Sequence, residues 1–174
     1  MKVLFTLLFF GLSITSYSQN LSLDELISLR KKDIANVEEY LSAKGWVLFS
    51  SDEGEDRSLD KVNFAYNKNE YSDSAESFLN YYYSDLTGIT RINLQIFNTI
   101  KYNPLLAKIK SYGCKLIDST ISDGKIKKTY QGATTTFMIS IATRKEEYSE
   151  STDTYYNLSI LENSDYELNF SESE

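Results

Sequence analysis

The sequence predicts an α+β protein, built from two tandem repeats of one helix followed by about four antiparallel strands, with the helices packed on one face of the sheet. Three observations support this fold class. Apolar residues recur at three- and four-residue spacing in two segments, the pattern of amphipathic helices. A glycine, Gly45 or Gly113, ends each of these segments. Alternating apolar and polar residues, the pattern of half-buried strands, then follow each glycine.

The first helix is expected to run without interruption from Ser22 to Gly45. Ser22 and Glu25 have the S-x-x-E spacing of a capping box, which satisfies free N–H groups at a helix start. Gly45 is expected to end the helix in the left-handed conformation, because glycine adopts that conformation without steric cost. Trp46 follows at once and has apolar neighbours, so we assign it to the core rather than to a ligand site.

Four strands are expected before residue 98. Their residues are 46–49, 62–66, 78–83 and 92–96. An acidic loop, residues 51–56, separates the first two. This loop lacks the alternating order of an EF-hand, so a solvated hairpin turn is favoured over a calcium site.

The second unit has the same order of elements. Apolar residues between Tyr102 and Tyr112 indicate a shorter helix, with Pro104 expected in its first turn, where a missing N–H costs little. Gly113 is expected to end this helix and Cys114 to open a strand. Four strands are then expected at residues 114–117, 126–131, 134–143 and 155–161.

Local matches between the two units indicate an internal repeat, with boundaries at 22–98 and 99–170. Five residues of the first unit match five residues of the second unit at one constant offset. In order, they are Leu41, Gly45, Trp46, Leu48 and Ser51 in the first unit, and Ile109, Gly113, Cys114, Leu116 and Ser119 in the second.

Residues 1–19 have the order of a cleavable secretory signal peptide, in which a charged residue, Lys2, precedes a short apolar run and then polar residues. The run of about ten apolar residues is half of what a membrane-spanning helix needs, so no membrane span is expected after cleavage. We therefore expect an exported, soluble mature domain, residues 20–174, in the periplasm or in the medium.

Composition excludes several classes of function. The formal net charge is -7, or -8 once Lys2 is removed with the signal peptide, which makes nucleic acid and anionic membranes poor partners. The chain has no histidine, which excludes Ser-His-Asp and Cys-His catalysis and makes zinc or copper sites unfavourable. No glycine-rich phosphate loop occurs. We therefore expect no enzyme activity, no cofactor and no metal.

Cys114 is the single cysteine, so an internal disulfide is excluded. A free cysteine with no histidine to activate it is expected to pack as a small buried hydrophobic residue. We expect Gly45, Trp46, Gly113 and Cys114 to have structural roles.

Tyrosine is abundant, with 14 residues. Tyr81 and Tyr83 share one face of a predicted strand, and Tyr155 and Tyr156 lie in a later strand. Rigid amphipathic rings suit contacts with proteins or glycans, so these four are the candidate binding residues. The alternative is that tyrosine is used here because it favours strands.

The tandem layout of helix, glycine junction and four strands resembles the fold of β-lactamase-inhibitor-protein type. Residues 40–46, 75–79 and 130–135 look like segments of small exported proteins of the Bacteroidota, and the signal ending in Gln19 is similar to signals of that phylum. The resemblance implies export and a fold. It implies no activity.

Two classes of function remain open. The first is a non-enzymatic envelope or secreted binding module, expected to be a monomer, whose partner is a protein or a glycan of the cell envelope. The second is a small hydrolase that uses carboxylate or tyrosine residues. The hydrolase would need a deep cleft where acidic groups converge.

Overall fold

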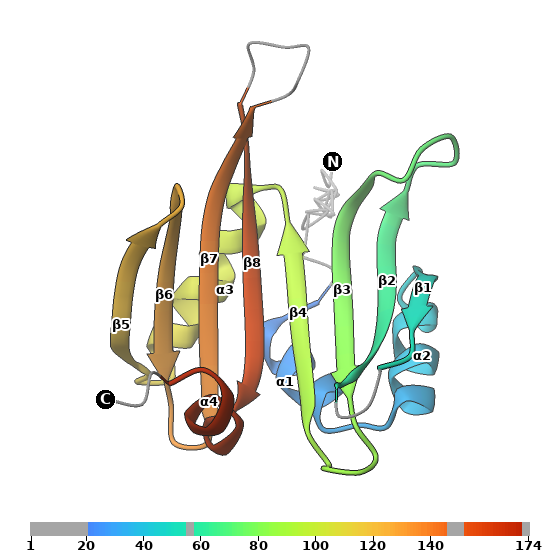
Figure 1. Ribbon diagram of the computed structural model, residues 1–174. Helices are drawn as coiled ribbons and strands as arrows, with labels where there is room; N and C mark the ends of the chain where they lie inside the picture. The colour runs from blue at the N-terminus through green and yellow to red at the C-terminus, as the bar shows by residue number, and fades with distance from the viewer. Residues whose placement is uncertain (1–20, 55–57, 146–151, 172–174) are drawn as a thin grey trace, which may run out of the picture.

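The computed structural model describes residues 21–54, 58–145 and 152–171 (Figure 1). The predicted signal peptide, residues 1–19, and two acidic loop residues, Glu55 and Asp56, lie outside this part. The described residues form four helices and one eight-stranded antiparallel sheet, which confirms the α+β fold class. The strand order is β1-β2-β3-β4-β8-β7-β6-β5.

The N-terminal segment forms two helices, α1 (Leu23–Arg30) and α2 (Ile34–Ala43), so the prediction of one continuous helix was wrong. Asp33 interrupts it, because its side chain accepts a hydrogen bond from the Asn36 backbone N–H at 2.9 Å. A capping side chain of this kind offers the backbone an alternative to helical hydrogen bonds and starts a new helix. The predicted capping box of Ser22 and Glu25 is confirmed.

Four consecutive strands follow: β1 (Trp46–Asp52), β2 (Asp60–Lys68), β3 (Ala75–Tyr83) and β4 (Thr90–Ile96). Each pairs with the next as an antiparallel hairpin. A register shift between Leu48 and Ser50 marks a bulge in the edge strand β1.

The next helix is α3 (Thr99–Ser111), followed by β5 (Lys115–Ser122), β6 (Lys125–Gln131), β7 (Thr135–Lys145) and β8 (Thr152–Glu162). Because α3 begins at Thr99 with Asn98 as its cap, Pro104 lies in the second turn and not in the first as predicted. Strand β8 pairs with β4, opposing Leu158 to Leu94, and this pairing joins all eight strands into one sheet.

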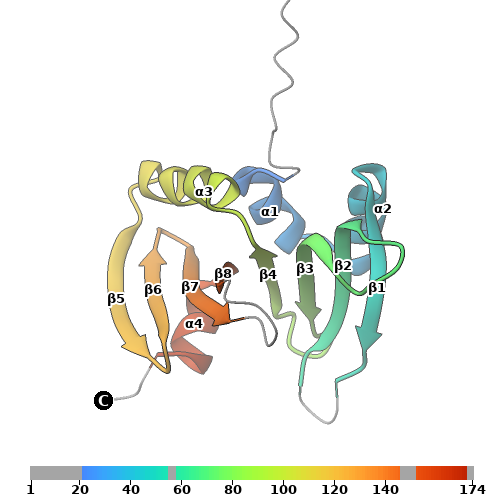
Figure 2. The same ribbon diagram turned by 90° about the horizontal axis from the view of Figure 1, so that it is seen from above.

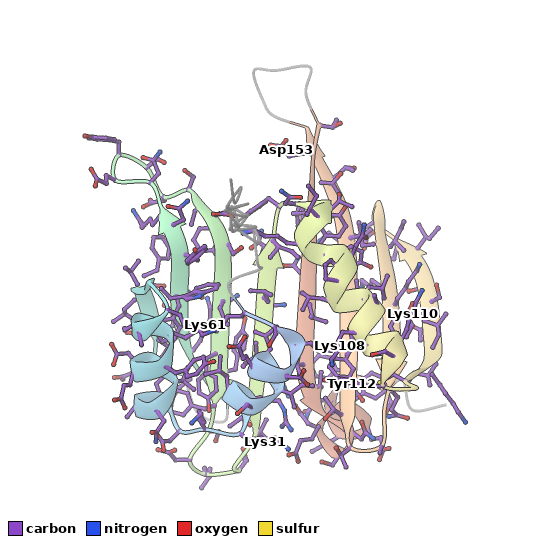
Figure 3. All side chains as sticks on the ribbon, turned by 180° about the vertical axis from the view of Figure 1, so that it is seen from behind. Lys31, Lys61, Lys108, Lys110, Tyr112 and Asp153 are labelled. Carbon is purple, nitrogen blue, oxygen red and sulfur yellow. The ribbon has the colours of Figure 1, made fainter. Side chains whose placement is uncertain are left out.

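Helices α1, α2 and α3 cover one face of the sheet, which we call the helix face (Figure 2). Their apolar sides pack on every second residue of the central strands, and these residues form the core. Examples are Leu79, Leu94, Leu158 and Ile139, each of which is at most 3% exposed. Figure 3, seen from the helix side, shows the end of α3 beside α1, where Asp24 accepts a hydrogen bond from Tyr112 and lies 3.3 Å from the Lys108 ammonium.

A fourth helix, α4 (Asn163–Asn169), lies on the opposite face, which we call the open face (Figures 1 and 2). All helices were predicted to lie on one face of the sheet, and α4 was not predicted. This helix has only seven residues and no side-chain hydrogen bond at its N-cap, so the usual start signal is missing. Within the described part of the chain, no helix has the length and apolar character that crossing a bilayer requires.

Candidate functional site

The four predicted tyrosines do not form one surface. Tyr81 is fully buried on the helix face, stacks on Tyr83 with ring centroids 5.7 Å apart, and donates a hydrogen bond to the Lys32 carbonyl. Burial raises the pKa of Tyr81 to about 12. Its side chain therefore belongs to the core, while Tyr83 is half-buried beside it.

The later pair divides between the two faces. Tyr156 is buried on the helix face, where its ring stacks on Tyr102 with centroids 4.3 Å apart and its hydroxyl lies 2.8 Å from that of Thr99. Tyr155 precedes it in β8, opposite Ala142 of β7, and is half-buried on the open face.

The four residues expected to have structural roles lie at the two helix ends. Gly45 and Gly113 have φ of +80° and +74°, the left-handed conformation expected for cap glycines. Trp46 is buried with its ring 5.4 Å from that of Tyr66. Cys114 is half-buried, which raises the pKa of its thiol, so the reactive thiolate is disfavoured.

The open face carries a row of polar side chains that crosses five neighbouring strands. Sheet register places these residues opposite one another: Ser50, Asn63, Asn80, Asn93 and Ser159. Asn63 donates to the Ser50 hydroxyl at 2.8 Å, Asn80 to the Asn93 carbonyl oxygen at 3.3 Å, and Asn93 to the Ser159 hydroxyl at 3.0 Å. We call this row the amide ladder.

Polar residues continue across the rest of the open face. The row of the amide ladder extends from Ser159 to Met138 of β7, Thr129 of β6 and Asp118 of β5. One row further along the strands, Asn157 of β8 opposes Ser140 of β7. The middle of the open face is therefore a floor of amides and hydroxyls that Met138 interrupts.

Two hollows lie on this floor. The smaller, of about 290 Å³, is lined by side chains that include Tyr82, Arg91 and Asn93. The larger, of about 820 Å³, is lined by side chains that include Asn157 and Tyr166. Both hollows include Met138, Ser159 and Phe170 in their lining, so they are neighbours, and we call the pair the trough.

Helix α4 forms one wall of the trough and is held by a charged pair. The Asp165 carboxylate accepts hydrogen bonds from Arg91 Nε at 2.6 Å and Nη2 at 2.7 Å, and from Asn169 Nδ2 at 2.8 Å. The Arg91 guanidinium lies 4.8 Å from the centroid of the Phe170 ring. These contacts fix the aromatic side chains of α4 over the floor.

The start of α4 is anchored independently. Asn163 donates to the carbonyls of Gly132 at 3.1 Å and Ala133 at 3.2 Å, and its own carbonyl oxygen accepts from the Thr136 hydroxyl at 2.9 Å. One side chain thus ties the helix to the turn between β6 and β7.

Charges in the trough largely cancel. Arg91 is paired with Asp165, which is only 5% exposed in its side chain. At the far end, Lys127 and Asp118 contribute opposite charges, and the third charged residue of that lining, Lys128, pairs in register with Ile139, whose side chain lies on the helix face. Asp118 is the one carboxylate in the described lining of the trough.

The trough offers donors and acceptors for binding, but its described lining lacks a pair of carboxylates for acid and base roles. Across residues 21–54, 58–145 and 152–171, no group of three or more Asp, Glu, Cys or His side chains could hold a metal ion. The described lining presents amides, hydroxyls, aromatic rings, one carboxylate and the cationic side chains of lysine and arginine.

Comparisons with protein-family models, with curated proteins and with solved structures gave no match to this chain. The candidate site is therefore argued from its geometry.

The amide ladder and the trough were not predicted from the sequence. Asn63, Asn80 and Asn93 alternate with buried residues, so the pattern could have placed each on the solvent side of its own strand. Only the register between strands brings them into one row. No sequence signal marked Tyr166 or Phe170, because α4 has no side-chain cap.

Proposed function

We propose that the protein is exported and acts as a non-enzymatic binding module, whose trough holds a ligand of the cell envelope or its surroundings. The observation that carries this proposal is the pair of neighbouring hollows on the open face, lined by amides, hydroxyls and Met138 and bordered by Tyr82, Tyr166 and Phe170. In ligand sites, aromatic and apolar side chains bury part of the ligand, and placed polar groups fix its orientation.

The lining favours binding over hydrolysis. Amide and alcohol side chains orient a ligand but do not exchange protons readily near neutral pH. A carboxylate hydrolase needs a second acidic group near the first, and Asp118 has no such neighbour in the described lining. Substrate turnover would therefore argue against this proposal and for the hydrolase.

Export rests on residues 1–19, where a charged residue, an apolar run and polar residues follow in the order of a signal peptide. We further propose that residues 22–98 and 99–170 are tandem repeats of the layout seen in proteins of β-lactamase-inhibitor-protein type. The strand order supports this, since β1 and β5 are the two edges and β4 and β8 the centre. We expect the mature domain to be a monomer.

The test is affinity capture from envelope and culture-medium fractions, using the domain from Asn20 onward. Captured material is identified both by protein mass spectrometry and by sugar composition, so that the assay does not presuppose the ligand. The trough variant carries Asn93→Ala and Asn157→Ala. The matched control carries Asn103→Ala, an exposed residue of α3 on the other side of the sheet.

We expect the native domain and the Asn103→Ala control to enrich the same material, and the trough variant to lose it. Circular dichroism and thermal unfolding establish that the trough variant is folded. Equal capture by all three proteins, or capture by none, would refute a binding role for the trough.

A further inference from the structure

We propose that the ligand of the trough is a neutral oligosaccharide. This inference rests on the proposed function and specifies its ligand class. Three features of the open face carry it: the pairing of donors with acceptors in the amide ladder, the aromatic rim, and the cancelled charge.

The amide ladder holds its side chains in fixed orientations and leaves hydrogen-bonding capacity toward solvent. Asn93 donates one N–H to Ser159 and accepts from Asn80, which leaves a second N–H and a lone pair. Each half-buried amide can thus present a donor and an acceptor side by side. A sugar hydroxyl also donates and accepts at one oxygen, so neighbouring hydroxyls of a sugar ring match this arrangement.

The rim supplies ring faces for the apolar side of a sugar. Tyr166 and Phe170 lie on α4 with ring centroids 6.5 Å apart and planes within 7° of parallel. Phe170 is 40% exposed with the Arg91 guanidinium 4.8 Å from its ring centroid, so a ligand can contact only the part of the ring that Arg91 leaves uncovered. Tyr82 lies at the other hollow. Aromatic side chains bury large apolar area at small entropy cost, which suits the C–H face of a pyranose ring.

The charge of the trough disfavours ionic ligands. Asp165 takes both facing N–H groups of Arg91, and Lys127 and Asp118 bring one charge of each sign to the open-face lining of the larger hollow. An acidic ligand would also approach a chain with a net charge of -7. A neutral ligand meets neither cost.

A peptide ligand fits the trough less well. Of the strands that line the trough, β3, β4, β8, β7 and β6 each pair on both sides, so only the outer edge of β5 could accept an added strand. A helical peptide requires an apolar groove, and here it would leave the amides of Asn93 and Asn157 unpaired. A polyhydroxylated ligand can form hydrogen bonds with both of these amides.

The test measures binding of defined oligosaccharides to the mature domain by calorimetry, after a screen on a glycan array. The neutral probes are cello-, xylo- and manno-oligosaccharides and N-acetylated chito-oligosaccharides. The acidic probes are oligogalacturonate and sialylated lactose. We expect at least one neutral series to bind, with affinity that rises with chain length as both hollows fill.

The Asn93→Ala/Asn157→Ala variant should bind the same probe at least about tenfold more weakly, since two amides are lost. Phe170→Ala, which leaves the amides in place, should also weaken binding. Asn103→Ala should bind as the native domain does. Thermal unfolding checks that each variant is folded.

Other outcomes overturn the inference in distinguishable ways. Binding of acidic probes alone would refute a neutral ligand. If no glycan on the array binds, but a protein from the envelope fraction is captured through the trough, the glycan proposal is refuted. The proposed function as a binding module is then supported. Glycan binding that neither trough variant alters would refute the assignment to the trough.

Discussion

Replacing Asp165 by alanine should release α4 from the open face without unfolding the domain. The Asp165 side chain is 5% exposed and that of Arg91 is 23% exposed, so their two hydrogen bonds are largely shielded from water. A helix of seven residues does not persist alone, because nucleation costs more than so few hydrogen bonds return. Without this pair, α4 keeps the anchor of Asn163 at its start but should open more often.

The magnitude follows from the geometry. A hydrogen bond to a charged group contributes about 1.5–3 kcal/mol, and the bidentate pair makes two, offset by the cost of taking both charges out of water. We expect a net destabilisation of α4 of about 2–3 kcal/mol. Opening of the helix should then become about 30- to 150-fold more frequent, while Asn163 and the sheet core remain in place.

Hydrogen exchange measures this opening directly. The Phe170 and Ser171 amides donate to the Tyr166 carbonyl, both at 2.9 Å, so their exchange reports α4. The control is Asp73→Ala, which removes a carboxylate with 90% exposure from a 3.7 Å pair with Lys68 and should have almost no effect.

An Arg91→Ala/Asp165→Ala double variant completes a cycle that isolates the pair. Unchanged exchange at Phe170 and Ser171 in Asp165→Ala would refute the reasoning and would assign the anchoring of α4 to Asn163 instead.

Two further predictions concern the helix ends. Burial opposes ionisation of Glu25, but hydrogen bonds from Lys44, Tyr40 and Ser22 outweigh it and lower its pKa from 4.5 to about 2. Because the pKa of Glu25 is lowered in the folded state, its ionised carboxylate stabilises the fold above pH 4.5, and this stabilisation is lost as the pH falls towards 2. Glu25→Gln should therefore lower the free energy of unfolding by about 1–2 kcal/mol at pH 6, after allowance for solvent screening, and by almost nothing near pH 2. Chemical unfolding at both pH values checks this, and an equal cost at both would contradict it. Gly45→Ala should cost about 1 kcal/mol because φ is +80°, although its new methyl group would lie 4.0 Å from Tyr66 and meet no clash. An unchanged urea midpoint would contradict this strain argument.

The local elements of the fold were predictable because their signals lie within a few residues. The capping box at Ser22, the glycines at 45 and 113 and the alternation in each strand act over one turn or one hairpin. Two errors came from the same short range. The Asp33 cap was read as part of a continuing helix, and the start of α3 was placed too late to locate Pro104.

The candidate site was not predictable to the same degree. Tyrosines were chosen because the residue type suits binding, but Tyr81 and Tyr156 lie in the core under the helices. The open face carries the trough, and its side chains come from strands far apart in the chain, such as Asn93 of β4 and Asn157 of β8.

The sequence by itself determined the α+β class, the order of most elements and the residue types excluded from catalysis, since periodicity and composition are local properties. Only the tertiary structure decided that β8 pairs with β4, which residues of eight strands share the open face, and that α4 lies upon it. The physical reason is that sheet register and the Arg91–Asp165 pair are contacts between distant residues. Their energy depends on how the whole chain packs and leaves no pattern in any one segment.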